Sequence, residues 1–342
     1  MVLYGLVVNI VALVESQSHV CCRYRVAAFR PLLAEAGYSL SLRSLPRSLL
    51  ARLNLFRSLR SADVVILQRR LLPAFELALL RRWAKKLVFD FDDAVWLRDS
   101  YSPKGFVSPK RARRFRATMQ AAEIVFAGNA YLADEARSQG AKQVVVVPTC
   151  VDPSTYPIAN HTSAAVRLVW VGSSSTLQGL ERFRDVLEAI GREVPGVRLK
   201  LICDRFLELR HLPVDAVPWS EATEATELAD AEIGIGWVPD DPWSRGKCGL
   251  KILQYHAAGL PVIANPIGVQ ADFVRDGETG LVANTPEDWV AAVRRLAQDA
   301  ELRRRLGARG RQQVEERFSV GVGARLWAQQ LDALRTSARN VG

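Results

Sequence analysis

Short runs of valine, isoleucine and leucine alternate with longer amphipathic segments along the whole chain, and this alternation restricts the fold more than any other feature. The runs lie at residues 3–10, 38–42, 63–67, 87–91, 123–127 and 143–147, and again at 167–172, 197–203, 215–219, 231–237, 261–265 and 279–283. Continuous apolar strands separated by helices are typical of parallel sheets that are covered on both faces. The sequence therefore predicts an α/β fold with two doubly wound, Rossmann-like domains facing a cleft.

Helices are predicted between these strands, and one proline-rich segment interrupts the alternation. The helices are expected at residues 23–36, 47–60, 72–86, 109–121, 130–139, 179–193, 221–229, 247–258, 286–299, 301–317 and roughly 320–338. The segment 148–157 contains three prolines and is interpreted as a linker. We therefore divide the chain into domains at 1–149 and 150–318, followed by a helical segment at 319–342 that is expected to pack back on the first domain.

Length and cysteine content indicate a globular protein of a reducing compartment. With 342 residues, the chain is long enough for two domains of roughly 150 residues. The five cysteines form no C-x-x-C pair, so neither a zinc site nor a disulfide framework is indicated. The apolar opening at residues 1–14 is too short to cross a bilayer and is interpreted as a buried first strand. We expect a cytoplasmic protein.

Positive charge is concentrated in the first half of the chain. Residues 1–149 contain 23 Lys and Arg against 11 Asp and Glu, whereas the remainder contains 23 against 25. Arginines punctuate the leucine-rich segment 42–60, and such segments suit an anionic membrane surface, where each cation contributes ~1 kcal/mol. Solvated helix faces are the alternative. Nucleic acid is disfavoured as a partner because the basic stretches lack interleaved aromatic side chains and no nucleic-acid motif occurs.

The segment 245–266 has the features of a ligand-binding helix. Gly246 and Gly249 at its start allow backbone N–H groups to approach a ligand closely. Helical spacing predicts that Lys247, Lys251 and Gln254 share one face. Two ammonium groups beside the positive end of a helix suit a diphosphate, and Gln254 suits hydroxyl groups. The alternative is an ordinary amphipathic helix with a solvated lysine face.

Several segments together resemble the GT-B glycosyltransferases, in particular glycosyltransferase family 4 and its group 1 relatives. The resemblance is carried by AAGLPVIANPIGVQADFVRDGETGLVA (257–283), by the helix pair that follows, by VVVPTCVDPSTY (145–156) and by LVWVGSSSTLQGL (168–180). It implies transfer of a sugar, with retention of configuration, from a nucleotide diphosphate donor bound mainly by the second domain. The first domain would then bind the acceptor.

The chain departs from the family pattern at positions near the donor. The family often has two glutamates eight residues apart around its donor helix, and Gly246 and Gln254 occupy the corresponding positions. Basic residues that often follow the first strand of the donor domain fall on Ser173 and Gln178. Either the cations have moved in this chain, which we favour, or catalysis is impaired.

Relocated cations would stabilise the leaving diphosphate, on which negative charge develops as the glycosidic bond breaks. Lys247 and Lys251 are the catalytic candidates for this role. The expected donor-binding residues are Gly172, Ser173, Arg205, Trp219, Arg245, Gly246, Lys247, Gly249, Lys251 and Gln254. Trp219 is either a platform for the nucleobase or a core tryptophan.

The acceptor-side candidates follow strands of the first domain. Asp90, Asp92 and Asp93 lie at the end of the strand at 87–91, where carboxylates bind an acceptor hydroxyl, act as a general base or hold a cation. We favour Asp92 as the base and Asp93 next, and a helix cap is the structural alternative.

Three further polar residues are acceptor-side candidates or structural residues. Arg23 and Arg25 either hold a phosphate or lie on the surface of a helix start. Asn129 either borders the acceptor or caps a helix. The lone imidazole of His19 is expected to be structural.

The resulting expectation is a metal-independent glycosyltransferase that needs no cofactor besides the nucleotide sugar. Its acceptor would be a lipid-linked or cell-envelope glycan, as in polysaccharide biosynthesis, and the basic first domain would attach it peripherally to the inner face of the membrane. A subunit that binds nucleotide or glycan without turnover and a nucleotide-sugar epimerase are the alternatives. No strand leads into G-x-G-x-x-G and no complete P-loop occurs, so an oxidoreductase and a P-loop NTPase are disfavoured.

Overall fold

A computed structural model describes residues 7–162 and 165–339, which form two compact units. The first unit consists of residues 1–150, 245–248 and 320–342, and the second of residues 151–244 and 249–319. All twelve expected strands are present within the described residues, six in each unit. Residues 3–6 of the first expected strand and residues 340–342 of the C-terminal segment lie outside the described part.

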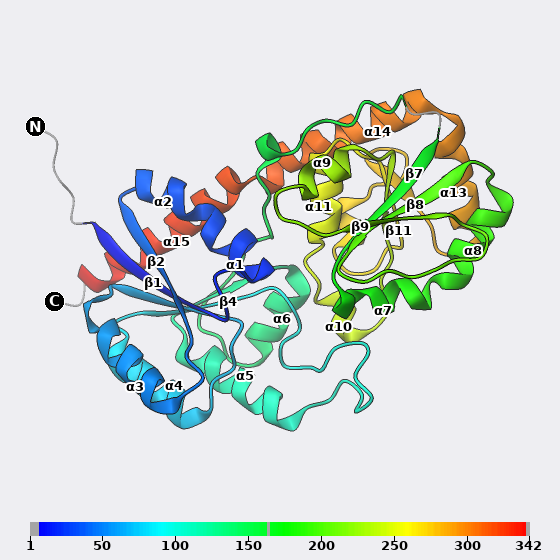
Figure 1. Ribbon diagram of the computed structural model, residues 1–342. Helices are drawn as coiled ribbons and strands as arrows, with labels where there is room; N and C mark the ends of the chain where they lie inside the picture. The colour runs from blue at the N-terminus through cyan, green and yellow to red at the C-terminus, as the bar shows by residue number, and fades with distance from the viewer. Residues whose placement is uncertain (1–6, 163–164, 340–342) are drawn as a thin grey trace, which may run out of the picture. The chain divides into compact units, whose positions relative to one another are not determined.

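The first unit is built on a six-stranded, fully parallel sheet with the order β2-β1-β3-β4-β5-β6. The strands are β1 (Val8–Val14), β2 (Tyr38–Ser44), β3 (Val64–Gln68), β4 (Leu87–Phe91), β5 (Ile124–Ala127) and β6 (Val144–Val146). One face is covered by α1 (Val20–Arg25), α2 (Arg30–Glu35) and α15 (Val320–Arg339) (Figure 1). The other face carries α3 (Leu49–Ser58), α4 (Ala74–Trp83), α5 (Pro109–Ala121) and α6 (Ala130–Ser138) (Figure 1).

The C-terminal helix α15 is part of the core of the first unit. The ring of Trp327 is fully buried, 5.4 Å from the centroid of Phe29 and 5.2 Å from that of Phe126. The hydroxyl of Tyr38 donates to Asp332 at 2.5 Å. Burial of a tryptophan on this scale contributes several kcal/mol, so α15 stabilises the sheet that the first half of the chain forms.

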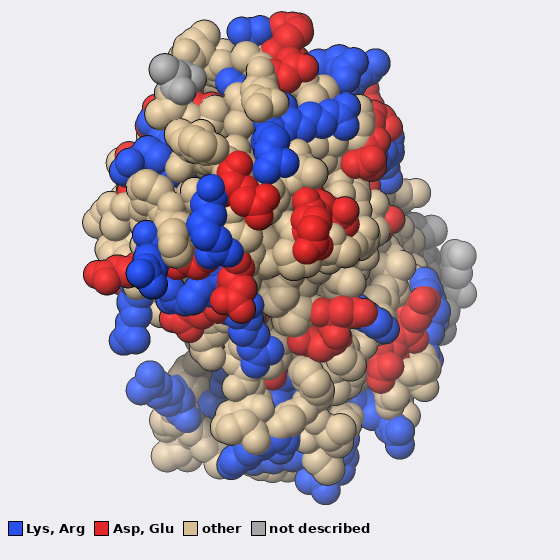
Figure 2. Space-filling view, turned by 90° about the vertical axis from the view of Figure 1, so that its right-hand side faces the viewer, with Lys and Arg blue, Asp and Glu red and all other residues tan. Residues whose placement is uncertain are grey.

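The basic residues of the first unit are concentrated on the helices of one face. Helices α3, α4 and α5 carry nine Lys and Arg residues and one acidic residue, Glu76. On the face drawn in Figure 2, Lys and Arg gather toward the lower end and mix with Asp and Glu over the rest of the surface.

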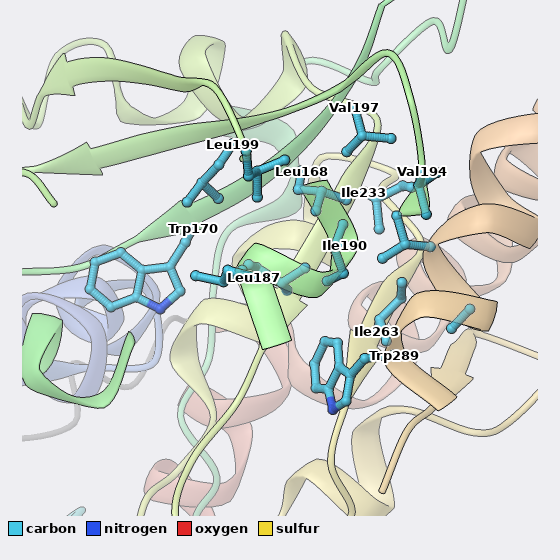
Figure 3. Packing of buried hydrophobic residues seen from close by; sticks show 14 of the residues in the cluster. Leu168, Trp170, Leu187, Ile190, Val194, Val197, Leu199, Ile233, Ile263 and Trp289 are labelled. Atoms are coloured by element: carbon cyan, nitrogen blue, oxygen red, sulfur yellow. The ribbon is translucent and has the colours of Figure 1, made fainter. Parts of the chain in front are cut away.

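The second unit repeats the plan with a parallel sheet in the order β12-β11-β10-β7-β8-β9. Its strands are β7 (Val166–Val171), β8 (Val197–Cys203), β9 (Val214–Pro218), β10 (Ile233–Gly236), β11 (Val262–Ala264) and β12 (Gly280–Val282). Its helices are α7 (Ser174–Arg182), α8 (Arg184–Glu193), α9 (Glu224–Ala229), α11 (Leu250–Ala257), α13 (Pro286–Gln298) and α14 (Ala300–Gln313). Figure 3 shows the apolar side chains that pack between this sheet and its helices, among them Leu168, Leu187, Ile190 and Trp289.

Helix boundaries differ from the expectation where the chain turns sharply. The helix expected at 23–36 is divided into α1, a 3₁₀ turn (Ala27–Phe29) and α2, and the one expected at 179–193 begins earlier and divides into α7 and α8. Two four-residue helices, α10 (Pro242–Arg245) and α12 (Gln270–Phe273), were not expected. A π-helical turn (Val314–Phe318) ends α14.

The expected helix at 247–258 begins only at Leu250. Gly249 precedes it with a φ of 64°, in the left-handed region, and a side chain there would collide with Phe273 and Val269. Lys247 therefore lies before the helix, and the helical face that it was expected to share with Lys251 and Gln254 does not form.

Each sheet has one point where the strand connections leave in opposite directions. This switch point lies between β1 and β3 in the first unit and between β7 and β10 in the second. Ligands of doubly wound sheets bind outside the carboxyl ends of the strands at such points. Among the described residues, no helix has the length and apolar character needed to span a membrane.

One buried histidine makes the second unit sensitive to acid. His256 on α11 is fully buried beside Gly310, and burial lowers the pKa of its imidazole to about 4, with only a partial offset from the backbone of Thr279. The unfolded chain takes up this proton near pH 6.5, whereas the folded chain does so only near pH 4. Stability is therefore lost as the pH falls through this window.

We predict that His256 makes the protein less stable by about 3 kcal/mol at pH 4 than at pH 7. Urea denaturation followed by circular dichroism at pH 7, 6, 5 and 4 measures this slope. The variant His256→Gln should have a flatter slope, because it has no imidazole to protonate. Equal slopes for wild type and His256→Gln would contradict the assignment.

Candidate functional site

A buried ion pair supports the switch point of the first unit. Arg25, the last residue of α1, is 1% exposed and contacts both carboxylate oxygens of Asp90 in β4, with a closest distance of 2.6 Å. Its Nη1 also donates to the carbonyl of Val147 at 2.9 Å, and Gln68 donates to Asp90 at 3.2 Å. Arg25 and Asp90 are thus occupied by each other in the interior and do not face an acceptor, contrary to the sequence prediction.

Arg69 binds the two remaining aspartates. It follows β3 with a φ of 56°, which a hydrogen bond from its backbone N–H to the carbonyl of Asp90 helps to fix. Its guanidinium lies 3.0 Å from Asp92 Oδ1 and 2.8 Å from Asp93 Oδ2, and it also contacts the Cys21 thiol. The cation that Asp92 and Asp93 bind is therefore the guanidinium of Arg69.

The two aspartates differ in exposure and in proton affinity. The side chain of Asp92 is 13% exposed and that of Asp93 is 20% exposed. Burial opposes the ionisation of Asp92, but Arg69 and Arg25 outweigh it and lower the pKa of this carboxyl. Burial raises the pKa of Asp93, and the charge of Asp92 adds to this although Arg69 and Lys247 act in the opposite direction. Asp93 is thus the stronger base of the two.

The segment 245–248 packs with the first unit, whereas the sequence assigned it to the second domain. Asn129 caps α6 by accepting from the N–H of Leu132, and its Nδ2 donates to the carbonyls of Gly246 and Lys247 at 3.2 and 3.1 Å. A side chain at position 246 would collide with Ala94, so Gly246 serves close packing rather than access for a ligand. Arg245 is exposed and Lys247 is half-buried.

In the second unit, Lys251 lies at the switch point. It stands in the first turn of α11, which follows β10, and its Nζ is 3.7 Å from the ring centroid of Trp170 in the neighbouring strand β7. This cation–π contact fixes a charge over the boundary between the two strands. Gly172 follows β7, and the ring of Trp170 occupies the space that a larger residue there would need.

A hydrogen-bonded network involves the expected donor residues Trp219 and Gln254. The indole of Trp219, half-exposed after β9, donates to Glu224 at 2.5 Å, and Gln254 donates to the other oxygen of Glu224 at 2.8 Å. Gln254 also donates to the hydroxyl of Tyr156 at 3.3 Å. Gln254 is buried, so it supports Glu224 rather than presenting its amide to solvent.

The start of α7 is already capped by protein groups. Ser173 forms a capping box with Thr176, and the N–H of Ser174 donates to the carboxylate of Asp204 at 2.5 Å. The hydrogen bond from Ser174 lowers the pKa of Asp204, which therefore places a negative charge here. Ser173 and Arg205 are both exposed. An anion at this helix end would have to displace Asp204 or bind beside it.

The structure therefore brings together part of the predicted site in each unit. Asp92, Asp93 and Lys247 belong to one group in the first unit. In the second, Gly172 and Trp219 each follow a strand, and Lys251 lies in the first turn of α11 against Trp170. Arg23 is half-buried beside Tyr24, and His19 caps α1 as expected. The functional candidates that the sequence analysis missed are Arg69 and Glu224.

The missed residues differ in how they could have been found. Arg69 directly follows a buried strand, as Asp92 and Asp93 do, but the sequence analysis included it only in the positive charge of the first half. Glu224 has no comparable signal because only the packing of α9 against α11 brings it to Gln254. Among the described residues, no three His, Cys, Asp or Glu side chains group as metal ligands would.

Comparison with known proteins confirms the resemblance to GT-B glycosyltransferases. Residues 181–328 match the family model "Glycosyl transferase-like". A D-inositol 3-phosphate glycosyltransferase from Nocardioides sp. is 40% identical over 62 residues, which is 18% of this chain and only 14% of that relative.

Solved structures share the fold over nearly the whole chain. Sucrose-phosphate synthase from Thermosynechococcus elongatus has a TM-score of 0.77 at 16% identity, covering 96% of this chain and 100% of that protein. Anabaena HepE, in complex with UDP and glucose, has a TM-score of 0.70 at 15% identity, covering 95% and 100%. The expected fold of two Rossmann-like units of the GT-B type is thus confirmed.

We predict that Asp90→Asn lowers the free energy of unfolding by about 3 to 5 kcal/mol, because it leaves the Arg25 guanidinium buried without a counter-charge. Asp93→Asn should cost less than about 1 kcal/mol, since Arg69 keeps Asp92 as a partner. Urea denaturation of both variants measures the difference. Equal losses of unfolding free energy in the two variants would contradict the assignment of Asp90 to a structural role and of Asp93 to an accessible position.

Proposed function

We propose that this protein is a glycosyltransferase that moves a sugar, with retention, from a nucleotide diphosphate sugar to a lipid-linked or cell-envelope glycan acceptor. The observation that carries the proposal is Lys251, a cation fixed at the switch point of a unit whose sequence matches glycosyltransferases. Two solved structures of the same fold were determined with UDP and glucose or with UDP-glucose, which supports a nucleotide sugar as the donor.

The second unit would hold the donor. Lys251 would bind the diphosphate, where a fixed ammonium stabilises the charge that develops on the leaving group. The half-exposed ring of Trp219 would stack against the base, held in orientation by Glu224. Gly172, Ser173 and Arg205 border the same strand ends and remain donor-binding candidates.

The first unit would bind the acceptor and contribute further cations. Asp93 would accept the proton of the attacking hydroxyl, because its raised pKa makes it a stronger base than Asp92. Asp92 would keep Arg69 in place beside it. Arg245 and Lys247 would contribute to neutralising the phosphates, and Arg23 would contact the acceptor.

The chemistry that we propose needs no cofactor besides the nucleotide sugar and no metal ion. Lysine and arginine side chains provide the positive charge that a divalent cation provides in other transferases. The protein would act at the cytoplasmic face of the membrane, in polysaccharide biosynthesis.

Replacement of Lys251 tests the donor site. Lys251→Met keeps most of the side chain that packs on Trp170 but removes the charge, so we expect turnover to fall roughly a hundredfold, or ~3 kcal/mol in activation free energy. The control Lys142→Met, at an exposed position of the first unit, should leave turnover unchanged. Initial rates with a panel of UDP-, GDP-, TDP- and ADP-sugars measure both, and wild-type turnover in Lys251→Met would remove the assignment.

Replacement of Asp93 tests the base. Asp93→Asn should lower turnover at least a hundredfold. In the wild type, the rate should rise with pH through the raised pKa of Asp93, since only the ionised carboxylate accepts a proton. Asp92→Asn should lower turnover less, and it should keep this limb but move it to lower pH, because the charge of Asp92 no longer raises the pKa of Asp93. A pH profile that is the same in wild type and Asp93→Asn would assign the proton transfer to another group.

Two other outcomes would select the alternative functions. Raised melting temperatures with nucleoside diphosphates, without turnover on any donor and acceptor pair, would indicate a binding subunit. Conversion of a nucleotide sugar in the absence of any acceptor would indicate an epimerase. Turnover that disappears on addition of EDTA would contradict metal independence.

A further inference from the structure

Three exposed apolar side chains lie at one end of helices α3 and α4. Leu49 and Leu50 begin α3, and Phe75 lies in the first turn of α4; Leu50 is 74% exposed and Phe75 54%. An ion pair of 2.7 Å between Arg52 and Glu76 joins the first turns of the two helices. The three apolar side chains therefore belong to one surface, which we call the apolar end.

Further exposed apolar side chains lie along the carboxyl edge of the sheet. Val107, 73% exposed, lies two residues before α5, Val20 begins α1 after β1, and Val146 ends β6. Among the large apolar side chains that are exposed in the described part of the first unit, only Val7 lies at the opposite edge. Arg69, Asp92 and Asp93 lie at this same carboxyl edge.

The surface beside the apolar end is strongly basic. Helices α3, α4 and α5 pack side by side and carry nine basic residues, whereas their one acidic residue, Glu76, is buried and paired with Arg52. The exposed cations include Arg57, Arg82, Lys110, Arg111 and Arg113. These three helices lie on one face of the sheet (Figure 1), and because each follows a strand, their first turns lie toward its carboxyl edge.

The chemistry of the apolar end and its neighbouring cations matches an anionic lipid surface. An anionic lipid–water interface takes up the apolar side chains and attracts the cations at the same time. A second copy of this surface would bring like charges together, which opposes self-association. A nucleic acid would attract the cations but would gain little from Leu50.

We infer that the apolar end and the basic faces of α3, α4 and α5 dock on an anionic lipid surface. The inference rests on the proposed function, in which the acceptor is lipid-linked, and it adds an orientation. The carboxyl edge that carries Asp93 would face the lipid, so the acceptor hydroxyl would reach the base from the plane of the headgroups.

Flotation of the full-length protein with lipid vesicles tests the inference. Vesicles of phosphatidylcholine mixed with phosphatidylglycerol should bind the protein, and vesicles of phosphatidylcholine alone should bind it much less. The variant Leu50→Ser/Phe75→Ser should bind about a hundredfold more weakly, roughly tenfold for each side chain. The control Ile158→Ser/Phe206→Ser, which replaces one exposed aliphatic and one exposed aromatic residue of the second unit, should bind like the wild type.

Charge reversal tests the basic face separately. Lys110→Glu/Arg113→Glu should weaken binding to the anionic vesicles at least about tenfold, and added salt should weaken the binding of the wild type. All the substituted side chains are exposed, so the variants should unfold at the same urea concentration as the wild type.

Three results would overturn the inference. The first is unchanged vesicle binding by Leu50→Ser/Phe75→Ser, and the second is binding to duplex DNA or RNA in place of vesicles. The third is concentration-dependent dimerisation that the same variant abolishes while vesicle binding persists. Failure of the proposed reaction is distinguishable, because vesicle binding is measured without donor or acceptor, and turnover on a detergent-solubilised acceptor is measured without vesicles.

Discussion

The buried pair of Arg25 and Asp90 is the interaction on which the carboxyl edge of the first unit depends. It joins α1 to β4, and the bonds to Val147 and Gln68 extend it to the end of β6 and to β3. Two charges can be buried together only when each satisfies the other. The pair therefore fixes the ends of the strands that precede Arg69, Asp92 and Asp93. The positions of the partly exposed carboxylates of Asp92 and Asp93 thus depend on the buried carboxylate of Asp90.

The second unit uses aromatic rings and a single carboxylate where the first uses ion pairs. The ring of Trp170 makes a cation–π contact with Lys251, and Glu224 accepts hydrogen bonds from Trp219 and Gln254. Gly246 and Gln254 replace the two glutamates often found in glycosyltransferase family 4, yet Gln254 in α11 donates to Glu224 of α9. A carboxylate is thus present beside α11 although α11 itself contains none.

The charge distribution connects the proposed chemistry with the proposed location. Arginines in the interior of the first unit bind the aspartates. Of the nine basic residues on α3, α4 and α5, six are exposed, and Arg52 and Arg81 pair with Glu76 and Glu123. The interior arginines change the proton affinity of the neighbouring aspartates over a few ångströms. The arginines and lysines of α3, α4 and α5 create an electric field that reaches about a Debye length from the surface. One excess of basic residues therefore serves two separate purposes in this interpretation.

The sequence by itself determined the twelve strands and the parallel α/β plan, because buried parallel strands and amphipathic helices leave local patterns of hydrophobicity. It also placed Asp92 and Asp93 at the end of a strand and Lys251 on a helix, since both follow from the local pattern. Only the tertiary structure decided that Arg25 and Asp90 form a buried ion pair and that Gln254 donates to Glu224 in the interior. It also decided that residues 245–248 pack with the first unit. These outcomes depend on contacts between residues distant in sequence, and local periodicity contains no information about such contacts.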